Sequence, residues 1–185
     1  MNQLDQTVLS LSQQEKENLK ELALASIRRA FEPSTELPEP SSEKLKRPFG
    51  VFITLRLEGS LRGCIGDIAA DRPLWESVQE MAEHAAFKDP RFPPLTSEEL
   101  GALDIEISVL SSLEECPEPG KIVPGRDGLA VQRGMHSGLL LPQVAREHGW
   151  DRETYLKEIC LKAGLPPDCW RSRKATLYWF QAEVF

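Results

Sequence analysis

Hydrophobic residues recur every three or four positions near the start of the chain. Six of them fall on one face of a helix: Leu19, Leu22, Ala23, Ile27, Ala30 and Phe31. The preceding Ser12-Gln13-Gln14-Glu15 is a capping-box signature, in which Ser12 accepts a hydrogen bond from the backbone N–H of Glu15 and the Glu15 carboxylate reaches back. The pattern predicts an amphipathic helix that begins at residue 12 or 13 and ends near residue 31.

Strict alternation of hydrophobic and polar residues predicts strands further along. In GVFITLRL the odd positions Val51, Ile53, Leu55 and Leu57 share one face, and in LDIEISVL the residues Leu103, Ile105, Ile107 and Val109 do the same. The second of these strands carries Asp104 and Glu106 on its other face, which predicts a half-buried strand. Further strands are predicted at LRGCIGDI, LAVQ, GLLL and ATLYWFQAEVF.

Helical periodicity returns between these strands. Helices are predicted from about Pro73 to Lys88, over PQVAREHG, and from about Arg152 to Ala163. Strand pairs interleaved with helices, without strict strand–helix alternation, predict the α+β class with a mainly antiparallel sheet. The order strand–strand–helix–strand, followed by strand–strand–helix–helix–strand, also indicates two related halves.

Length and composition suit an ordinary globular protein with 41% hydrophobic and 28% charged residues. We expect one domain over residues 1–185, with the N-terminal helix at 12–31, an exposed Pro/Ser/Glu-rich connector at 32–48 that buries nothing, and a core at 49–185. The net charge of −7 disfavours general nucleic-acid binding and binding to anionic membranes. No apolar stretch reaches the roughly 18 residues of a membrane span, and the N-terminus lacks the pattern of a signal peptide. We therefore expect a cytoplasmic protein.

The four cysteines, Cys64, Cys116, Cys160 and Cys169, have no C-x-x-C spacing, and the chain has three histidines. This pattern disfavours a zinc site and predicts free thiols, with Cys160 in the core of its helix. We expect no metal and no cofactor.

The segment LRGCIG, Leu61 to Gly66, combines an arginine and a cysteine with two glycines in a predicted strand. Alternation places Leu61, Gly63 and Ile65 on one face and Arg62, Cys64 and Gly66 on the other. A three-residue loop, Glu58-Gly59-Ser60, would place Thr54 opposite Cys64 and Arg56 opposite Arg62.

This arrangement makes Cys64 the candidate catalytic residue. Nearby arginines favour a thiolate, and Gly66 would leave a notch beside the sulfur for a small anionic or electrophilic ligand. We therefore assign ligand binding to Arg62, Gly63 and Gly66 of the motif, and to Thr54 and Arg56 across the ladder. The structural alternative is that Cys64 packs as a small hydrophobe and the glycines admit a helix close to the sheet.

Other candidates lie in two loops and on one strand. His136, in the turn RGMHSG, is a weak candidate for a base to Cys64, and Arg133 of the same segment is a candidate ligand-binding residue. In FKDPRFPP, Arg91 either recognises an anion or pairs with Asp89. Asp104 and Glu106 allow acid–base chemistry, although an exposed strand face explains them as well.

With these residues placed, four segments of the chain resemble the AMMECR family: GVFITLRLEGSLRGCIG, AAFKDPRFPPLTSEEL, LDIEISVL and GLLLPQVAREHGWDRETYLKEICLKAGL. LRGCIG is that family's hallmark motif, and the resemblance extends from about Leu11 to Phe185. Prokaryotic members are called AmmeMemoRadiSam system protein A. The resemblance implies an α+β fold with a barrel-like, mostly antiparallel sheet, built from two related halves and flanked by helices.

The resemblance implies two partners, a Memo-family protein and a radical S-adenosylmethionine enzyme, but no particular reaction. Three functions stay open at this point. The protein is an enzyme or small-ligand-binding protein that uses the Cys64 segment, a non-enzymatic interaction module of the same system, or, disfavoured by its acidic charge, an RNA-related protein. Whether it is an enzyme is undecided.

Overall fold

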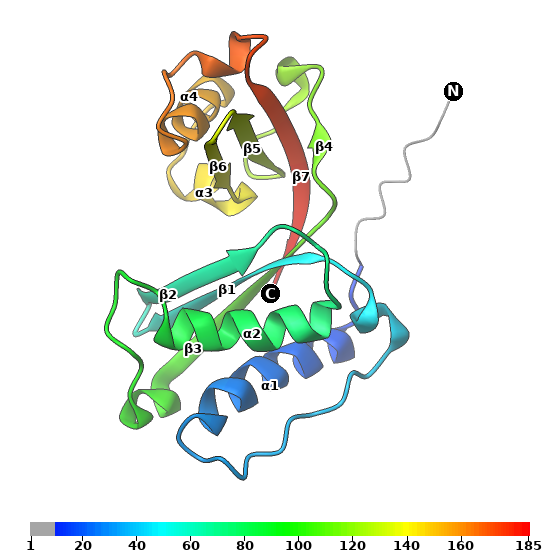
Figure 1. Ribbon diagram of the computed structural model, residues 1–185, viewed down its shortest axis with the longest axis vertical. Helices are drawn as coiled ribbons and strands as arrows, with labels where there is room; N and C mark the ends of the chain where they lie inside the picture. Colours follow the sequence, from blue (N-terminus) through cyan, green and yellow to red (C-terminus); the bar gives the residue numbers. More distant parts are fainter. Residues whose placement is uncertain (1–9) are drawn as a thin grey trace. The chain divides into compact units, whose positions relative to one another are not determined.

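The computed structural model describes residues 10–185, which divide into two compact units (Figure 1). The first unit comprises the described residues up to Leu110 together with Glu183–Phe185, and the second comprises Ser111–Ala182. Both units combine helices with antiparallel strand pairs, which confirms the predicted α+β class. That the whole chain is one domain stays a prediction.

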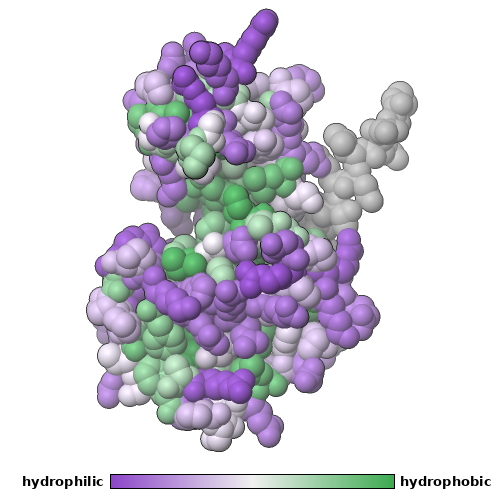
Figure 2. Space-filling view, viewed as in Figure 1, coloured by the Kyte–Doolittle hydropathy of each residue, from purple (hydrophilic) through white to green (hydrophobic). Residues whose placement is uncertain are grey.

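The first unit places two long helices on one face of three adjacent antiparallel strands (Figure 1). Its elements are α1 (Gln13–Arg29), η1 (Glu43–Lys46), β1 (Gly50–Leu57), β2 (Ser60–Asp67), α2 (Leu74–Phe87), η2 (Ser97–Ala102) and β3 (Leu103–Leu110). Strand β1 lies between β2 and β3, so β2 is an edge strand. The apolar face of the sheet packs under the helices, while hydrophilic side chains cover the outer side of α2 (Figure 2).

Helix α1 begins as the sequence predicts. The Ser12 side chain accepts a hydrogen bond from the N–H of Glu15, and the Glu15 carboxylate accepts one from the N–H of Ser12. Leu19, Leu22, Ala23 and Ile27 are fully buried. The helix ends at Arg29, two residues earlier than predicted. Phe31 lies in the turn that follows the helix, and its ring packs edge-on against the ring of Phe87 at the end of α2.

The connector after α1 was expected to bury nothing, and this prediction is wrong. Leu45, in η1, is fully buried. The side chain of Asn18 donates to the carbonyl of Glu39 and accepts from the N–H of Ser41, which fixes the connector along the helix. A proline-rich, polar segment is thus held by backbone hydrogen bonds to a helix side chain and by one buried leucine.

The β1–β2 hairpin has a two-residue loop in place of the predicted three-residue loop. Glu58 and Gly59 both have positive φ (50° and 78°), which is the geometry of a tight hairpin turn. The predicted Thr54–Cys64 pairing is confirmed, but the register shifts between Leu55 and Arg56. Arg56 therefore lies opposite Leu61, and the prediction that it faces Arg62 is wrong.

The register shift is a β-bulge at Arg62, which compensates for the shorter loop. A bulge interrupts the alternation of side chains, so Leu61 leaves the apolar face on which the sequence placed it. It is 39% exposed. Beyond the bulge the predicted alternation holds.

The second unit contains the remaining strands and helices. Its elements are β4 (Glu114–Glu115), η3 (Pro119–Lys121), β5 (Asp127–Arg133), β6 (His136–Leu140), α3 (Pro142–Glu147), α4 (Arg152–Lys162), η4 (Cys169–Arg171) and β7 (Thr176–Val184). Strand β5 pairs with β6 and β7, and β4 pairs with β7. Tyr155 is at the centre of the core, with its hydroxyl 3.1–3.3 Å from three backbone carbonyl oxygens, and burial raises its pKa.

The last residues of the chain return to the first unit. Phe185 exchanges two backbone hydrogen bonds with Ile107 of β3, at 2.8 and 3.1 Å. The Glu183 carboxylate accepts the N–H of Leu11 and forms an ion pair with Lys16. The edge of β3 is thereby paired at Ile107.

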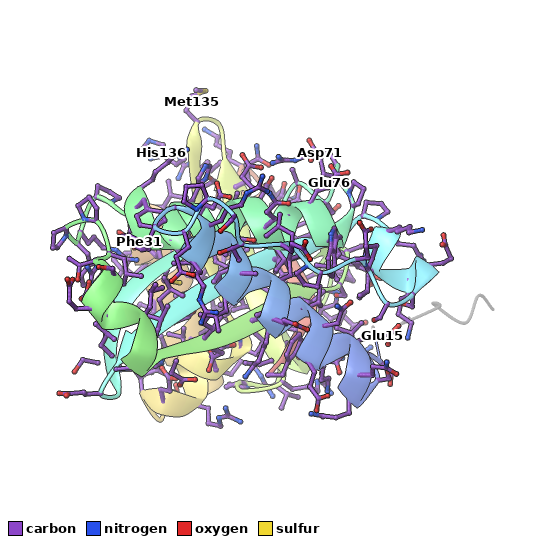
Figure 3. All side chains as sticks on the ribbon, turned by 90° about the horizontal axis from the view of Figure 1, so that it is seen from below. Glu15, Phe31, Asp71, Glu76, Met135 and His136 are labelled. Carbon is purple, nitrogen blue, oxygen red and sulfur yellow. A yellow bond between two sulfur atoms is a disulfide. The ribbon has the colours of Figure 1, made fainter. Side chains whose placement is uncertain are left out.

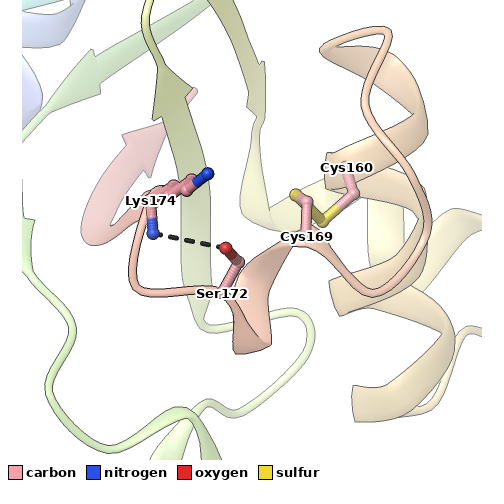
Figure 4. The surroundings of a disulfide bond; sticks show 4 residues. All are labelled: Cys160, Cys169, Ser172 and Lys174. Atoms are coloured by element: carbon pink, nitrogen blue, oxygen red, sulfur yellow. Dashed lines mark hydrogen bonds between the residues drawn. A yellow bond between two sulfur atoms is a disulfide. The ribbon is translucent and has the colours of Figure 1, made fainter.

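Cys160 and Cys169 form a disulfide between α4 and η4 (Figure 4). The prediction of free thiols is therefore wrong for these two residues. After α4 the chain reverses at Gly164, whose φ is +69°, and returns to place Cys169 with its Cα 5.9 Å from that of Cys160. In the described part of the chain, Cys64 and Cys116 are the free cysteines.

Candidate functional site

Gly63 lies where the backbone of α2 packs directly on β2. A Cβ atom added at this position would lie 2.1 Å from the carbonyl oxygen of Ala85. No side chain fits in that space, so the close approach of helix and strand requires glycine. Of the two explanations that the sequence offered for the glycines, the structure supports helix packing at Gly63.

Gly66 is covered by an aromatic ring from the neighbouring strand. A Cβ atom on Gly66 would lie 2.3 Å from the ring of Phe52, its partner across the β1–β2 ladder. The notch expected beside the sulfur is therefore filled by Phe52, and that prediction is wrong. The glycine gives the ring a flat surface on which to pack.

Arg62 binds a carboxylate and two carbonyls of the segment that follows α2. Its guanidinium forms a two-point ion pair with Glu99, at 2.8 and 3.0 Å, and also donates to the carbonyl oxygens of Pro93 and Pro94. These hydrogen bonds from Arg62 lower the pKa of Glu99. The Arg62 side chain is only 11% exposed, and its positive charge is balanced by Glu99 within the first unit. A direct contact between Arg62 and a ligand stays a prediction.

Glu99 was missed by the sequence reasoning although a signal was present. Thr96-Ser97-Glu98-Glu99 is a capping box that starts η2, and the Glu99 carboxylate accepts the N–H of Thr96. The motif marks the start of the short helix, but only the fold brings it to Arg62.

Asp89 and Arg91, which we call the edge clamp, hold the backbone of Cys64. The Asp89 carboxylate accepts the N–H of Cys64 at 2.9 Å, and the Arg91 guanidinium donates to the carbonyl of Cys64 at 3.0 Å. The two side chains also pair with each other, at 2.6 and 2.9 Å. Of the two roles considered for Arg91, pairing with Asp89 is the one observed.

The edge clamp replaces a neighbouring strand at this position of β2. Asp89 has a side chain that is only 2% exposed, and the hydrogen bonds from Arg91 hold its pKa well below the usual range. Because both backbone groups of Cys64 point to the clamp, Thr54 and Cys64 form a non-hydrogen-bonded pair, in which side chains lie closest. The local position of Cys64 is thus fixed from two sides.

The thiol of Cys64 lies on the face of the sheet that is opposite α2. Its sulfur is 3.4 Å from the hydroxyl oxygen of Thr54, which is 6% exposed. Thr54 in turn lies opposite Glu106 on β3, so Cys64, Thr54 and Glu106 form one row across three strands. Arg56 and Asp104 form the next row. We call these five residues the polar face.

The polar face brings together residues that the sequence treated separately. Asp104 and Glu106 share the polar face of β3, and Glu106 is half-buried, next to the Cys64–Thr54 pair. Cys64 is itself half-buried and free. The arrangement offers a nucleophile, a hydroxyl group and a carboxylate on one surface.

Comparison with protein-family models matches residues 20–185 to the AMMECR1 family. The chain belongs to this family. The resemblance seen in the sequence is thereby confirmed, and LRGCIG lies within the matched region as the segment around Cys64.

AMMECR1-family relatives cover most of the chain. A protein from Methanothermobacter thermautotrophicus is 44% identical over 183 residues, which are 95% of each chain. A protein from Thermococcus gammatolerans is 49% identical over 160 residues, 81% of this chain and 78% of the relative. The crystal structure of the uncharacterized protein PH0010 from Pyrococcus horikoshii matches with a TM-score of 0.81 at 40% identity, over 92% of this chain and 91% of that one. These comparisons establish the family and its fold.

His136 and Arg133 belong to the second unit of this AMMECR1-family protein. They face each other across the β5–β6 ladder at the tip of its hairpin, next to Met135, which is 99% exposed (Figure 3). His136 is exposed as well. Their proposed roles as base and ligand-binding residue stay predictions.

Within residues 10–185, no group of three or more His, Cys, Asp or Glu side chains is placed to hold a metal ion. In the same range, no helix is both long and apolar enough to cross a membrane.

Proposed function

We propose that this AMMECR1-family protein binds a small ligand on the polar face and that the Cys64 thiol is the group that contacts or attacks it. The observation that carries the proposal is the placement of Cys64. The edge clamp binds both its backbone N–H and its carbonyl, and a buried hydroxyl lies 3.4 Å from its sulfur. A nucleophile held in one geometry reacts more efficiently than one that must be oriented during the reaction.

Each residue of the site has a distinct part in this proposal. The Thr54 hydroxyl shares a hydrogen bond with the sulfur and holds it in place, and Arg56 lines the face beside it. Arg91 positions Cys64 through its carbonyl. Arg62, Gly63 and Gly66 keep β2 against α2 and the proline-rich segment, so they support the site from beneath.

Alkylation of the folded protein by iodoacetamide tests the proposal. The sulfur of Cys64 would form a bond to carbon, iodide would leave, and the thiol proton would pass to solvent. Peptide mass spectrometry then gives the rates for Cys64 and Cys116 across neutral and alkaline pH. We expect Cys64 to be labelled in the folded protein, whereas Cys116 is 7% exposed, has a pKa raised by burial, and should be labelled only after unfolding.

Two matched variants separate the role of Thr54 from general damage to a sheet. Thr54→Val should slow the labelling of Cys64 at neutral pH several-fold, because the sulfur loses the hydrogen-bond partner that holds it in place. Thr176→Val makes the same change on β7 of the second unit and should leave the labelling of Cys64 unchanged. If Cys64 is as protected as Cys116 in the folded protein, the thiol site is wrong.

In that case the second candidate applies, a non-enzymatic interaction module. It is favoured by one observation: Arg62, Gly63 and Gly66 are all engaged inside the first unit, while Leu61 at the bulge is 39% exposed. The partners we propose are a Memo-family protein and a radical S-adenosylmethionine enzyme, as the resemblance implies. On this model, Leu61→Glu abolishes binding to one of these purified partners and Cys64→Ser leaves it intact. An RNA-related role stays disfavoured by the net charge of −7.

A further inference from the structure

The arginines that would attract an anionic ligand to Cys64 are already neutralised. Arg62 has its two-point ion pair with Glu99, at 2.8 and 3.0 Å, and is 11% exposed. Arg91 pairs with Asp89 at 2.6 Å and donates a further hydrogen bond to the carbonyl oxygen of Cys64. The Arg91 side chain is 54% exposed and its charge also acts on the Cys64 side chain, but each of the two cations is already paired with a carboxylate.

The remaining charges on the polar face are two carboxylates and one guanidinium. Arg56 lies directly opposite Asp104 on β3, and opposite charges in such cross-strand pairs offset one another. Glu106 lies opposite Thr54, and within residues 10–185 no cation forms an ion pair with it. The uncompensated charge nearest the thiol in this row is therefore negative.

The spacing of the strands sets the distance between the two groups. Non-hydrogen-bonded and hydrogen-bonded antiparallel pairs have Cα atoms about 4.5 and 5.5 Å apart, so the Cα atoms of Cys64 and Glu106 are roughly 10 Å apart across Thr54. A small molecule is long enough to reach across this distance.

We propose that the ligand of the polar face is a small molecule with a cationic or hydrogen-bond-donating nitrogen, which faces Glu106 while another part of the ligand contacts the Cys64 sulfur. The inference rests on the proposed function, since it names the ligand class of the same site. It replaces the anionic ligand suggested by the arginines of the sequence.

Charged thiol probes test this preference on the protein as it exists. Trimethylammonioethyl methanethiosulfonate is cationic and sulfonatoethyl methanethiosulfonate is anionic. In both reactions the sulfur of Cys64 attacks the thiosulfonate sulfur, a mixed disulfide forms, methanesulfinate leaves, and the thiol proton passes to solvent. The rate of each probe at Cys64, read from its peptide, is divided by the rate of the same probe with free mercaptoethanol.

We expect the normalised rate to be about five-fold higher for the cationic probe, the size of one carboxylate acting on opposite charges at about 8 Å in a water-like medium. Glu106→Gln should remove most of this preference. Glu21→Gln, which deletes the same charge on the exposed side of α1, should leave it unchanged.

The possible failures are distinguishable. If neutral methyl methanethiosulfonate and both charged probes leave Cys64 unmodified, the thiol site itself is wrong. If Cys64 reacts but prefers the anionic probe or neither, or if the cationic preference survives Glu106→Gln, the ligand class is wrong and the thiol site stands.

Discussion

The two units solve the same packing problem at the same place in a hairpin. In the first, Gly63 of β2 lies opposite Leu55, and the backbone of α2 packs on it. In the second, Gly138 of β6 lies opposite Val131, and Ala163 at the end of α4 packs on it. Both hairpins have two-residue loops with glycine at positive φ, Gly59 and Gly134. The two related halves indicated by the order of elements thus have a counterpart in detail.

The units differ at the neighbouring pair. Where the first unit has Thr54 opposite Cys64, the second has Ala130 opposite Leu139. The glycine is therefore explained by the helix that packs on it, and the residue that follows it is where the two units differ. A motif that looks like one unit in the sequence thus has a part that packs against a helix, Gly63, and a part that our proposal assigns to ligand binding, Cys64.

An aspartate paired with a nearby arginine also occurs in both units, but it holds a different part of the chain in each. Asp127 pairs with Arg126 at 2.7 Å and accepts the backbone N–H of Val123, as Asp89 pairs with Arg91 and accepts that of Cys64. In the second unit this fixes a loop, and in the first it fixes a strand that carries a thiol. An aspartate–arginine pair thus holds the backbone in both units, and in the first unit the residue that it holds is Cys64.

The largest expected loss of folding stability comes from adding a methyl group at Gly63, and the matched comparison is the same change at Gly138. In Gly63→Ala the new carbon would lie 2.1 Å from a backbone oxygen that cannot rotate away, so we expect the first unit to lose about 3 kcal/mol or more. In Gly138→Ala the nearest atom is 3.0 Å away, and the second unit should lose about 1 kcal/mol. Urea unfolding followed by hydrogen exchange of peptides from each unit measures both losses. Equal losses would contradict the prediction that Gly63 is the more tightly constrained of the two glycines.

Acid should weaken the first unit through Glu15. Burial alone would raise the pKa of this carboxyl, but hydrogen bonds from Ser42, Ser12 and Lys44 outweigh it and lower the pKa to about 2. Because the folded pKa lies below the unfolded value of about 4.3, this contribution is present above that pH and is lost as the pH falls towards 2. It amounts to about 3 kcal/mol.

Thermal unfolding between pH 5 and pH 2 measures this loss, and Glu15→Gln is the matched variant. The variant should begin less stable at pH 5 and lose less stability as the pH falls. Parallel curves for the two proteins would mean that Glu15 is not the group responsible.

A somewhat smaller effect is expected from the disulfide, which only the second unit has. Cys160 and Cys169 are nine residues apart, and a loop of this size contributes about 2–3 kcal/mol by restricting the unfolded chain. Reduction with a phosphine, or the double variant Cys160→Ala with Cys169→Ala, should lower the unfolding temperature of the second unit and leave hydrogen exchange in the first unit unchanged. Loss of protection in the first unit on reduction would contradict this assignment.

Local pattern predicted much of this fold, and long-range contacts account for what it missed. Alternation placed β1, β2 and β3 and the Thr54–Cys64 pair, because side-chain direction in a strand is set by its own residues. Alternation failed at Arg56 and Leu61. The loop is one residue shorter than predicted, which shifts the strand pairing next to it, and the bulge at Arg62 restores the predicted pairing from Gly63 onward. One residue of loop length decides such a register.

The candidate site depended more on the fold. Arg62 was expected to act on Cys64 two residues away, but it binds Glu99, which is 37 residues away. The disulfide was likewise invisible, because its cysteines meet only after the chain reverses at Gly164. Neither spacing nor composition records which distant partner a charged or sulfur-bearing side chain will find.

The pairing of Phe185 with Ile107 has a consequence for how the protein is made. Domains emerging from the ribosome usually fold in order, the N-terminal one first. Here the first unit receives its final backbone pairing from residues that are translated after the whole second unit. While β5, β6 and α4 are being synthesised, the outer edge of β3 at Ile107 stays without that partner. The unit that begins folding first is therefore the last to be completed, and a nascent chain stalled before Glu183 would present an open strand edge to its surroundings.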